Sequence, residues 1–233
     1  MSGTGEVAAA AAAFVGSHFA LSHPLRAPLV RALGQPGFLL GYAVVAFATL
    51  GWLAEAFRRA PMGELWWPVG DELWAVATVV MLVASVLLIG SLVRNPAMPS
   101  GGAPAAALGE ARGVFAVTRH PMMWSFALWS AAHLLVMPYL PNAILVAAIA
   151  VLALAGAAMQ DRKKEHLEPE RWRPWEARTS YWPFAAIVQG RARFGGFGAH
   201  ALGGGVLLWL AATWAHIPLA GWAAGVWRWV PPS

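Results

Sequence analysis

Hydrophobic residues occur in long blocks along this chain, separated by shorter polar, glycine-rich or proline-rich segments. A block of about 20 apolar residues has the length that a helix needs to cross a bilayer. We predict six such helices, at residues 7–23, 37–57, 72–93, 117–135 and 143–159 and within 199–222. The pattern therefore predicts an all-α fold, a polytopic membrane helix bundle of about six transmembrane helices.

The segments between the blocks support this interpretation. The first block lacks the basic residues that precede the apolar part of a cleaved signal peptide, so we interpret it as a membrane span. Trp66 and Trp67 follow the second block, as is typical of aromatic residues at the lipid headgroups. We find no repeat of fixed period and no boundary that splits off a second domain. Residues 1–233 are therefore predicted to form a single transmembrane domain.

The amino-acid composition supports a membrane protein and excludes chemistry that depends on cysteine. Hydrophobic residues make up 59% of the chain and charged residues 12%, against about 25% charged residues in typical soluble domains. The absence of cysteine excludes disulfides, cysteine-bound zinc and thiolate catalysis, so any haem or metal must depend on histidine. We expect the lipid bilayer as the main surrounding and no nucleic acid as partner.

The distribution of basic residues predicts the orientation. All but three of the 16 lysines and arginines lie in the first, third and fifth loops, and Arg58, Arg59 and Arg228 are the exceptions. Basic loops remain in the cytoplasm. Both termini are therefore predicted to be non-cytoplasmic, with the long polar region 160–193 inside the cell.

Histidines within the apolar blocks are the candidate functional residues, because ionisable groups in a membrane are costly. Five of them lie in or near predicted spans: His18, His23, His120, His133 and His216. Imidazole is a common ligand of haem iron, although a capping or interfacial role is the alternative for each. On one straight helix, His120 and His133 are separated by about 20 Å and 220°, so they cannot both bind one iron.

Arg119, His120 and Pro121 mark the start of the fourth predicted span. Proline in the first turn leaves backbone donors free, and the two basic side chains beside it form a candidate pocket for a carboxylate, a haem propionate or a phosphate. The alternative is that Arg119 serves topology alone.

Several segments together resemble the NnrU family of bacterial membrane proteins. They are GSHFALSHPLR (16–26), VTRHPMMWSFALWSAAHLL (117–135), DRKK (161–164), TSYWPFAAIVQGR (179–191) and AHIP (215–218). The resemblance implies a multi-pass protein of the bacterial inner membrane that is linked to nitrite and nitric oxide metabolism in denitrification.

The Arg-His-Pro segment, the histidine that follows it and the TSYWPFAAIVQGR segment are also similar to plant zeta-carotene isomerase. That resemblance implies haem b held by His18 and His133, with His23 as an alternative to His18, and isomerase chemistry on a hydrophobic small molecule. The predicted topology places His18 nearer the cytoplasmic face and His133 nearer the opposite face. By depth alone, His18 pairs more easily with His120, and His133 with His216.

A more distant resemblance is to the isoprenylcysteine and phospholipid methyltransferases. It implies an S-adenosylmethionine site formed by Arg119, His120 and residues 161–170. Here Met123 and Ser125 replace the usual tyrosine and glycine. The third hypothesis for the function is a non-catalytic membrane assembly factor.

Overall fold

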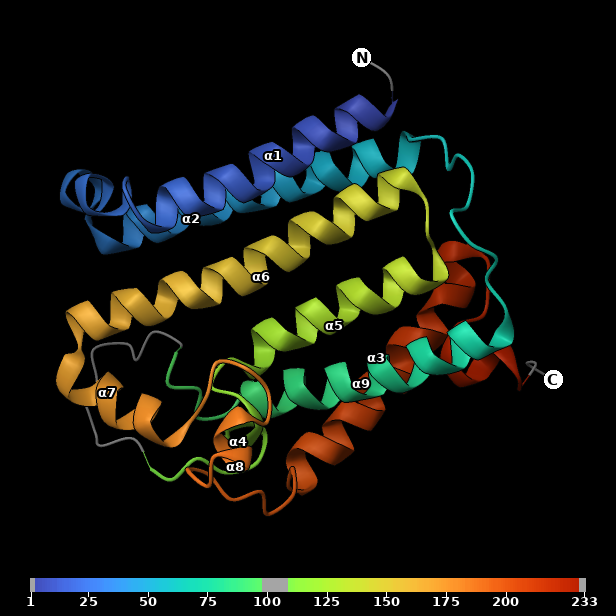
Figure 1. Ribbon diagram of the computed structural model, residues 1–233. Coiled ribbons are helices and arrows are strands. Elements are labelled where there is room, and N and C mark those ends of the chain that lie inside the picture. The colour runs from blue at the N-terminus through green and yellow to red at the C-terminus, as the bar shows by residue number, and fades with distance from the viewer. Residues whose placement is uncertain (1–2, 98–108, 231–233) are drawn as a thin grey trace. The chain divides into compact units, whose positions relative to one another are not determined.

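The structure, a computed structural model, describes residues 3–97 and 109–230 (Figure 1). These residues form helices, turns and loops without any strand, which confirms the all-α prediction. The elements are α1 (Gly3–Ser22), α2 (Arg26–Arg59), α3 (Asp71–Ser91), α4 (Val114–Val117), α5 (Pro121–Val136), α6 (Leu140–Leu167), α7 (Pro169–Arg178), α8 (Ala185–Val188), α9 (Ala199–Ala220) and the 3-10 helix η1 (Gly225–Arg228).

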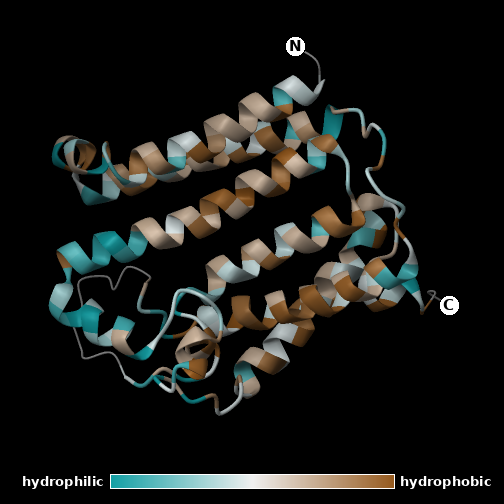
Figure 2. Cartoon of the chain, in the orientation of Figure 1, coloured by the Kyte–Doolittle hydropathy of each residue, from teal (hydrophilic) through white to brown (hydrophobic). Residues whose placement is uncertain are grey.

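Four helices in the described part of the chain are long and apolar enough to cross a membrane: α2, α3, α6 and α9. Helix α5 is apolar but has only 16 residues, and α1 is not among the four. Figure 2 shows hydrophobic residues along α3 and α9, and hydrophilic residues in α7 and the last turns of α6. The chain is a multi-pass membrane protein, and the prediction of about six spans is not confirmed beyond these four.

Helices extend further into the predicted loops than the hydrophobic pattern indicated. The connector expected at residues 24–36 is mostly helical, because α2 begins at Arg26 and continues across a kink at Gly34. Gly34 has a φ of 70°, a left-handed conformation that glycine adopts without steric cost. Likewise α6 continues to Leu167, and Lys164 in its last turns binds Glu168 at 2.8 Å. Such pairs stabilise helices that no longer have an apolar face.

The chain divides into two compact units that interleave in sequence. The first consists of residues 1–69 and 133–152, and the second of residues 70–132 and 153–233. Each unit has its own apolar cluster. The single-domain prediction stays a prediction.

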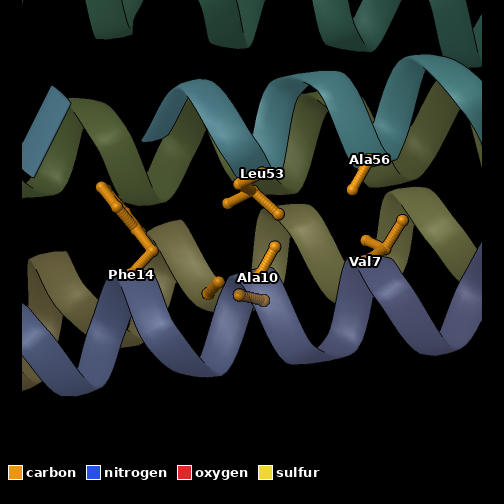
Figure 3. Packing of buried hydrophobic residues seen from close by; sticks show 7 residues of the cluster. Val7, Ala10, Phe14, Leu53 and Ala56 are labelled. Atoms are coloured by element: carbon orange, nitrogen blue, oxygen red, sulfur yellow. The ribbon is translucent and has the colours of Figure 1, made fainter. Parts of the chain in front are cut away.

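In the first unit, α1 packs along α2 and against the start of α6. The buried cluster consists of Val7, Ala10, Ala11, Phe14, Leu53, Ala56 and Ala148 (Figure 3). Alanines in this cluster allow the helix backbones to approach closely, as is common in membrane proteins. The packing fixes α1 up to Phe14, one turn before His18.

In the second unit, α3 packs against α9 through glycines. A Cβ atom added at Gly205 of α9 would lie 2.7 Å from the Cα atom of Val86, so a larger residue does not fit there. Trp209 Nε1 donates a hydrogen bond of 3.1 Å to the carbonyl of Thr78. Val86 also belongs to a buried cluster with Trp172 and Trp175 of α7. This cluster fixes α7, which carries part of the candidate site.

Candidate functional site

Thr118, Arg119 and His120 form a short non-helical link in the second unit between α4 and α5. Thr118, at the C-terminal end of α4, has φ −156° and ψ 151°, and α5 begins at Pro121. The single helix expected over residues 117–135 is therefore wrong in its first four residues. Proline still occupies the first helical position, where its missing N–H removes no helical bond. His120 precedes the helix that contains His133.

Residues 118–120 stay outside the helices because the chain here pairs with the segment after α7. Arg119 N donates to the carbonyl of Ser180 at 2.8 Å, and Phe184 N donates to that of Val117 at 2.7 Å. The fully buried Thr118 donates through Oγ1 to the carbonyl of Tyr181, at 2.7 Å. These bonds satisfy buried backbone groups and fix the positions of Arg119 and His120.

Asp161 of α6 joins both of these side chains. Its Oδ2 lies 2.8 Å from Nε and 2.7 Å from Nη2 of Arg119, and its Oδ1 lies 2.7 Å from Nε2 of His120. The exposed side-chain fractions are 14% for Arg119, 9% for Asp161 and 0% for His120. Charge-assisted hydrogen bonds of this length are among the strong ones in proteins. The trio is a buried and tightly bonded charge network.

Glu176 of α7 is the second carboxylate of this network. Its Oε1 lies 3.3 Å from Nη2 of Arg119. Burial, followed by a hydrogen bond with Glu165, raises the pKa of Glu176 to about 7, against the opposing effect of the Arg119 charge. Glu176 therefore exchanges a proton near neutral pH, and Asp161 is the carboxylate that lies closest to Arg119.

Tyr181 packs beside this network. Burial, followed by the negative charge of Asp161, raises the pKa of Tyr181 above its usual value. Its hydroxyl therefore stays protonated, and it donates to the carbonyl of Leu154 at 2.8 Å. The ring packs edge-on against His120, with 5.9 Å between the ring centroids.

The imidazole of His120 has one unused nitrogen. Because the Asp161 carboxylate accepts a hydrogen bond, Nε2 carries a proton. Nδ1 is buried and has no hydrogen-bond partner among the described residues. In the neutral ring this atom holds a lone pair, which can accept a proton or a hydrogen bond. The arrangement positions one basic atom beside a fixed charge network.

The Arg119 guanidinium is already bound to protein carboxylates. Its Nε and Nη2 face Asp161 and Glu176, so an external anion has to compete with both. The predicted role of Arg119 and His120 in anchoring an anionic cofactor group stays a prediction.

His18 and His133 lie in the first unit. Nδ1 of His18 donates to the carbonyl of Phe14 at 2.7 Å, which leaves the lone pair on Nε2. The ring packs edge-on against the rings of Phe14 and Tyr42. His133 is half-buried in the last turn of α5, and its carbonyl accepts from Met137 N at 2.9 Å.

The two histidines lie at different levels of this unit. Val7 packs near Ala56, and the neighbouring Phe57 stacks on Tyr139, six residues after His133. His133 is therefore near the end at which α1 begins, whereas His18 follows Val7 by about 16 Å of helix. Across residues 3–97 and 109–230, no group of three or more His, Cys, Asp or Glu side chains is placed to hold a metal ion.

The other candidate histidines divide between the units. His23 belongs to the first unit, and His120 and His216 belong to the second. The pairing of His18 with His133 is thus a pairing within one unit. It stays a prediction, as do the alternatives.

Comparison with known proteins agrees with the features above. The model of the NnrU family, described as NnrU protein, matches residues 6–224. The chain therefore belongs to the NnrU family. It is also similar to 15-cis-zeta-carotene isomerase, chloroplastic, of Zea mays, with 37% identity over 84 residues, which is 35% of this chain and 22% of that protein. The chain thus matches about a fifth of the length of this relative, and no solved structure matches it.

Sequence reasoning found part of the charge network. It selected Arg119 and His120, and it placed Asp161 near them only in the methyltransferase alternative. It did not select Thr118, Glu176 or Tyr181. The available signal for Glu176 was a carboxylate beside Trp175, a large apolar residue in an otherwise polar segment.

Proposed function

We propose that this membrane protein of the NnrU family binds haem b through His18 and isomerises double bonds of a hydrophobic polyene. His133 is the proposed second ligand, and because it lies at a different level of the first unit in this structure, it reaches the same iron only if the helices shift along one another. The hydrogen bond from His18 Nδ1 to the Phe14 carbonyl carries the proposal. A histidine that ligates iron through one nitrogen commonly donates its other N–H to a carbonyl or carboxylate, which fixes the tautomer. His18 meets this requirement before any iron binds.

The surroundings of His18 suit a flat apolar group. Phe14 and Tyr42 lie at 4.5 and 5.6 Å from its ring, by centroid distances. Apolar surroundings control solvent access and the reduction potential of an iron site. When bound, haem supplies an iron centre that acts as a Lewis acid on an electron-rich polyene. The residues of the chain hold the ligand nitrogens and exclude water.

The exposed surface of α2 supports a substrate that arrives from the lipid. Its apolar side chains Leu40, Val44 and Phe47 are between 59% and 74% exposed. A membrane-dissolved polyene can therefore reach the first unit without crossing water. We also propose a role in nitrite and nitric oxide metabolism, which rests on family membership.

An absorption spectrum of the purified protein tests haem binding without any substrate. We expect a Soret band that is lost in His18→Ala and His133→Ala. His216→Ala is the matched control, because His216 Nδ1 makes the same type of bond to the carbonyl of Ala212, at 2.8 Å. A folded protein that stays colourless after supply of haem contradicts the proposal. If the band is lost in His216→Ala and kept in His18→Ala, the ligand is His216 of α9 in place of His18.

A second candidate function is S-adenosylmethionine-dependent methyl transfer. One observation favours it: the Arg-His-Pro segment contacts Asp161 at the start of the acidic segment expected for that cofactor. Saturable binding of S-adenosylmethionine that Arg119→Gln weakens supports this candidate. Absence of binding at millimolar cofactor removes it.

A further inference from the structure

A cavity of about 570 Å³ in the second unit is rich in arginine. It lies among residues 110–113, the last residue of α7 and the segment after α8. Its lining consists of Glu110, Ala111, Arg112, Gly113, Arg178, Gly190, Arg191, Ala192, Arg193, Phe194, Gly195 and Gly196. Four guanidinium groups thus face one carboxylate. None of these residues belongs to the Arg119 network or the histidine pair.

Arg191 builds the wall of this cavity. Its Nη1 donates to the carbonyls of Glu176, Ala177 and Thr179 at 2.6 to 3.2 Å, where α7 ends. Its Nε and Nη2 bind Oε1 of Gln189. Basic side chains stabilise the free carbonyls at the C-terminus of a helix. Arg191 therefore has a structural role and fixes the segment that carries Arg193.

The arginines of this lining outnumber its carboxylates. Arg112 Nη2 binds Oε2 of Glu110 at 2.7 Å. This bond, followed by the charges of Arg112, Arg178 and Arg193, holds the pKa of the Glu110 carboxyl below its usual range. The single carboxylate of the lining thus stays ionised and pairs with Arg112, whereas Arg178 also has partners outside the lining, among them the carbonyl of Pro174, to which its Nε donates at 3.0 Å. Like charges gathered in one cavity repel each other unless an anion joins them.

The charge and shape of this lining favour a phosphate group. Guanidinium groups present planar pairs of N–H donors that match phosphate oxygens, and arginine is preferred where phosphate is bound. Within the described part of the chain, no other acidic side chain lines the cavity.

Exposed apolar residues lie beside the arginines in sequence. Trp182, Phe184 and Val188 are 64%, 52% and 85% exposed, and Phe194 in the cavity wall is 43% exposed. Aromatic residues next to basic groups are typical of the headgroup layer of a membrane. The apolar residues therefore favour a phosphate that is attached to a lipid.

We propose that this cavity binds a phosphate group, supplied by the headgroup of an anionic phospholipid or by a free phosphate compound. The site is independent of the proposed haem site and of the isomerase function. It assigns a binding role to the basic segment 190–196, which neither of these uses.

The test compares ligands on the full chain in neutral detergent. Binding of short-chain phosphatidylglycerol and of inorganic phosphate is measured by titration. The test variant is Arg178→Gln/Arg193→Gln, and Arg191 is left intact because it caps α7. The control is Arg162→Gln/Arg173→Gln, which removes the same charge at two exposed positions of the same unit outside the cavity.

We expect the test variant to bind at least about tenfold more weakly than wild type, since charge-assisted hydrogen bonds are lost. The control variant should retain the wild-type affinity. Tighter binding of phosphatidylglycerol than of phosphate identifies the lipid as the source, and the reverse order identifies a free phosphate compound. Equal weakening in both variants, or no saturable binding to wild type, overturns the proposal. Should the double variant unfold at a lower temperature than the control, Arg193→Gln alone replaces it and has to weaken binding.

Discussion

His120 and Asp161 are joined by a hydrogen bond of 2.7 Å between Nε2 and Oδ1, across 41 positions of the chain. The bond fixes which imidazole nitrogen carries the proton, and it leaves Nδ1 buried without a partner among the described residues. Because Arg119 occupies the other carboxylate oxygen, Asp161 is the centre of the buried network.

Removal of the Asp161 charge should destabilise the protein. Asp161→Asn leaves the buried Arg119 without its closest counter-charge, which typically costs about 3–5 kcal/mol. Unfolding by denaturant in detergent measures the change. Asp71→Asn is the control, because Asp71 is 69% exposed in its ion pair with Arg228, and exposed pairs contribute at most about 1 kcal/mol. Equal losses in the two variants contradict a structural role for the network.

Stability should fall as the pH rises towards neutrality, through Glu176. Its pKa in the folded protein is about 7, above the ordinary value of 4.5, so the folded state holds this proton more tightly than the unfolded state. The contribution is full below pH 4.5 and is lost as the pH passes through 7. This contribution to the free energy of unfolding is of the order of 2 kcal/mol, a value reduced for screening because the Glu176 side chain keeps part of its contact with water.

Thermal unfolding between pH 4 and pH 8 in detergent tests this effect. Glu176→Gln should flatten the pH profile, since the amide does not titrate. Glu170→Gln, at an exposed position of the same helix, should leave the profile as in wild type. A profile that Glu176→Gln does not change assigns the pH dependence to other groups.

The contact between α3 and α9 should not tolerate a larger residue at Gly205. A Cβ atom there would lie 2.7 to 2.9 Å from the backbone and side chain of Val86, so Gly205→Val forces the helices apart. Overpacking of this kind typically costs about 1–3 kcal/mol. The unfolding temperature should fall in Gly205→Val and stay near wild type in Gly203→Val, where no atom lies within 4 Å of an added Cβ. Equal behaviour of both variants would show that the helices do not pack through this face.

Sequence reasoning was most successful where the controlling property is local. The apolar blocks predicted α2, α3, α6 and α9, because twenty consecutive apolar residues satisfy a bilayer whatever their neighbours are. Pro121 occupies the first position of α5, where proline is well tolerated, although the predicted span begins four residues earlier. The segments around His18, His120 and His133 predicted the family, which the match over residues 6–224 confirms.

Helix ends and polar pairs were less predictable. The kink at Gly34 depends on a glycine in the segment predicted to be a connector, and α7 lies in a polar segment with no apolar block to predict it. Glu176 is one acid among several in residues 160–178, and the tryptophan beside it is a weak signal, because Glu170 also lies near a tryptophan, Trp172.

By itself, the sequence determined the fold class and the family, and it selected Arg119 and His120 of the charge network, because hydropathy, proline positions and short motifs are properties of neighbouring residues. Only the tertiary structure decided how those residues pair. Asp161 meets Arg119 across 42 positions, and Arg191 meets the end of α7 across at least 12. Such contacts depend on how α6, α7 and the Arg-His-Pro segment pack in the second unit, and a pattern along the chain does not contain that information.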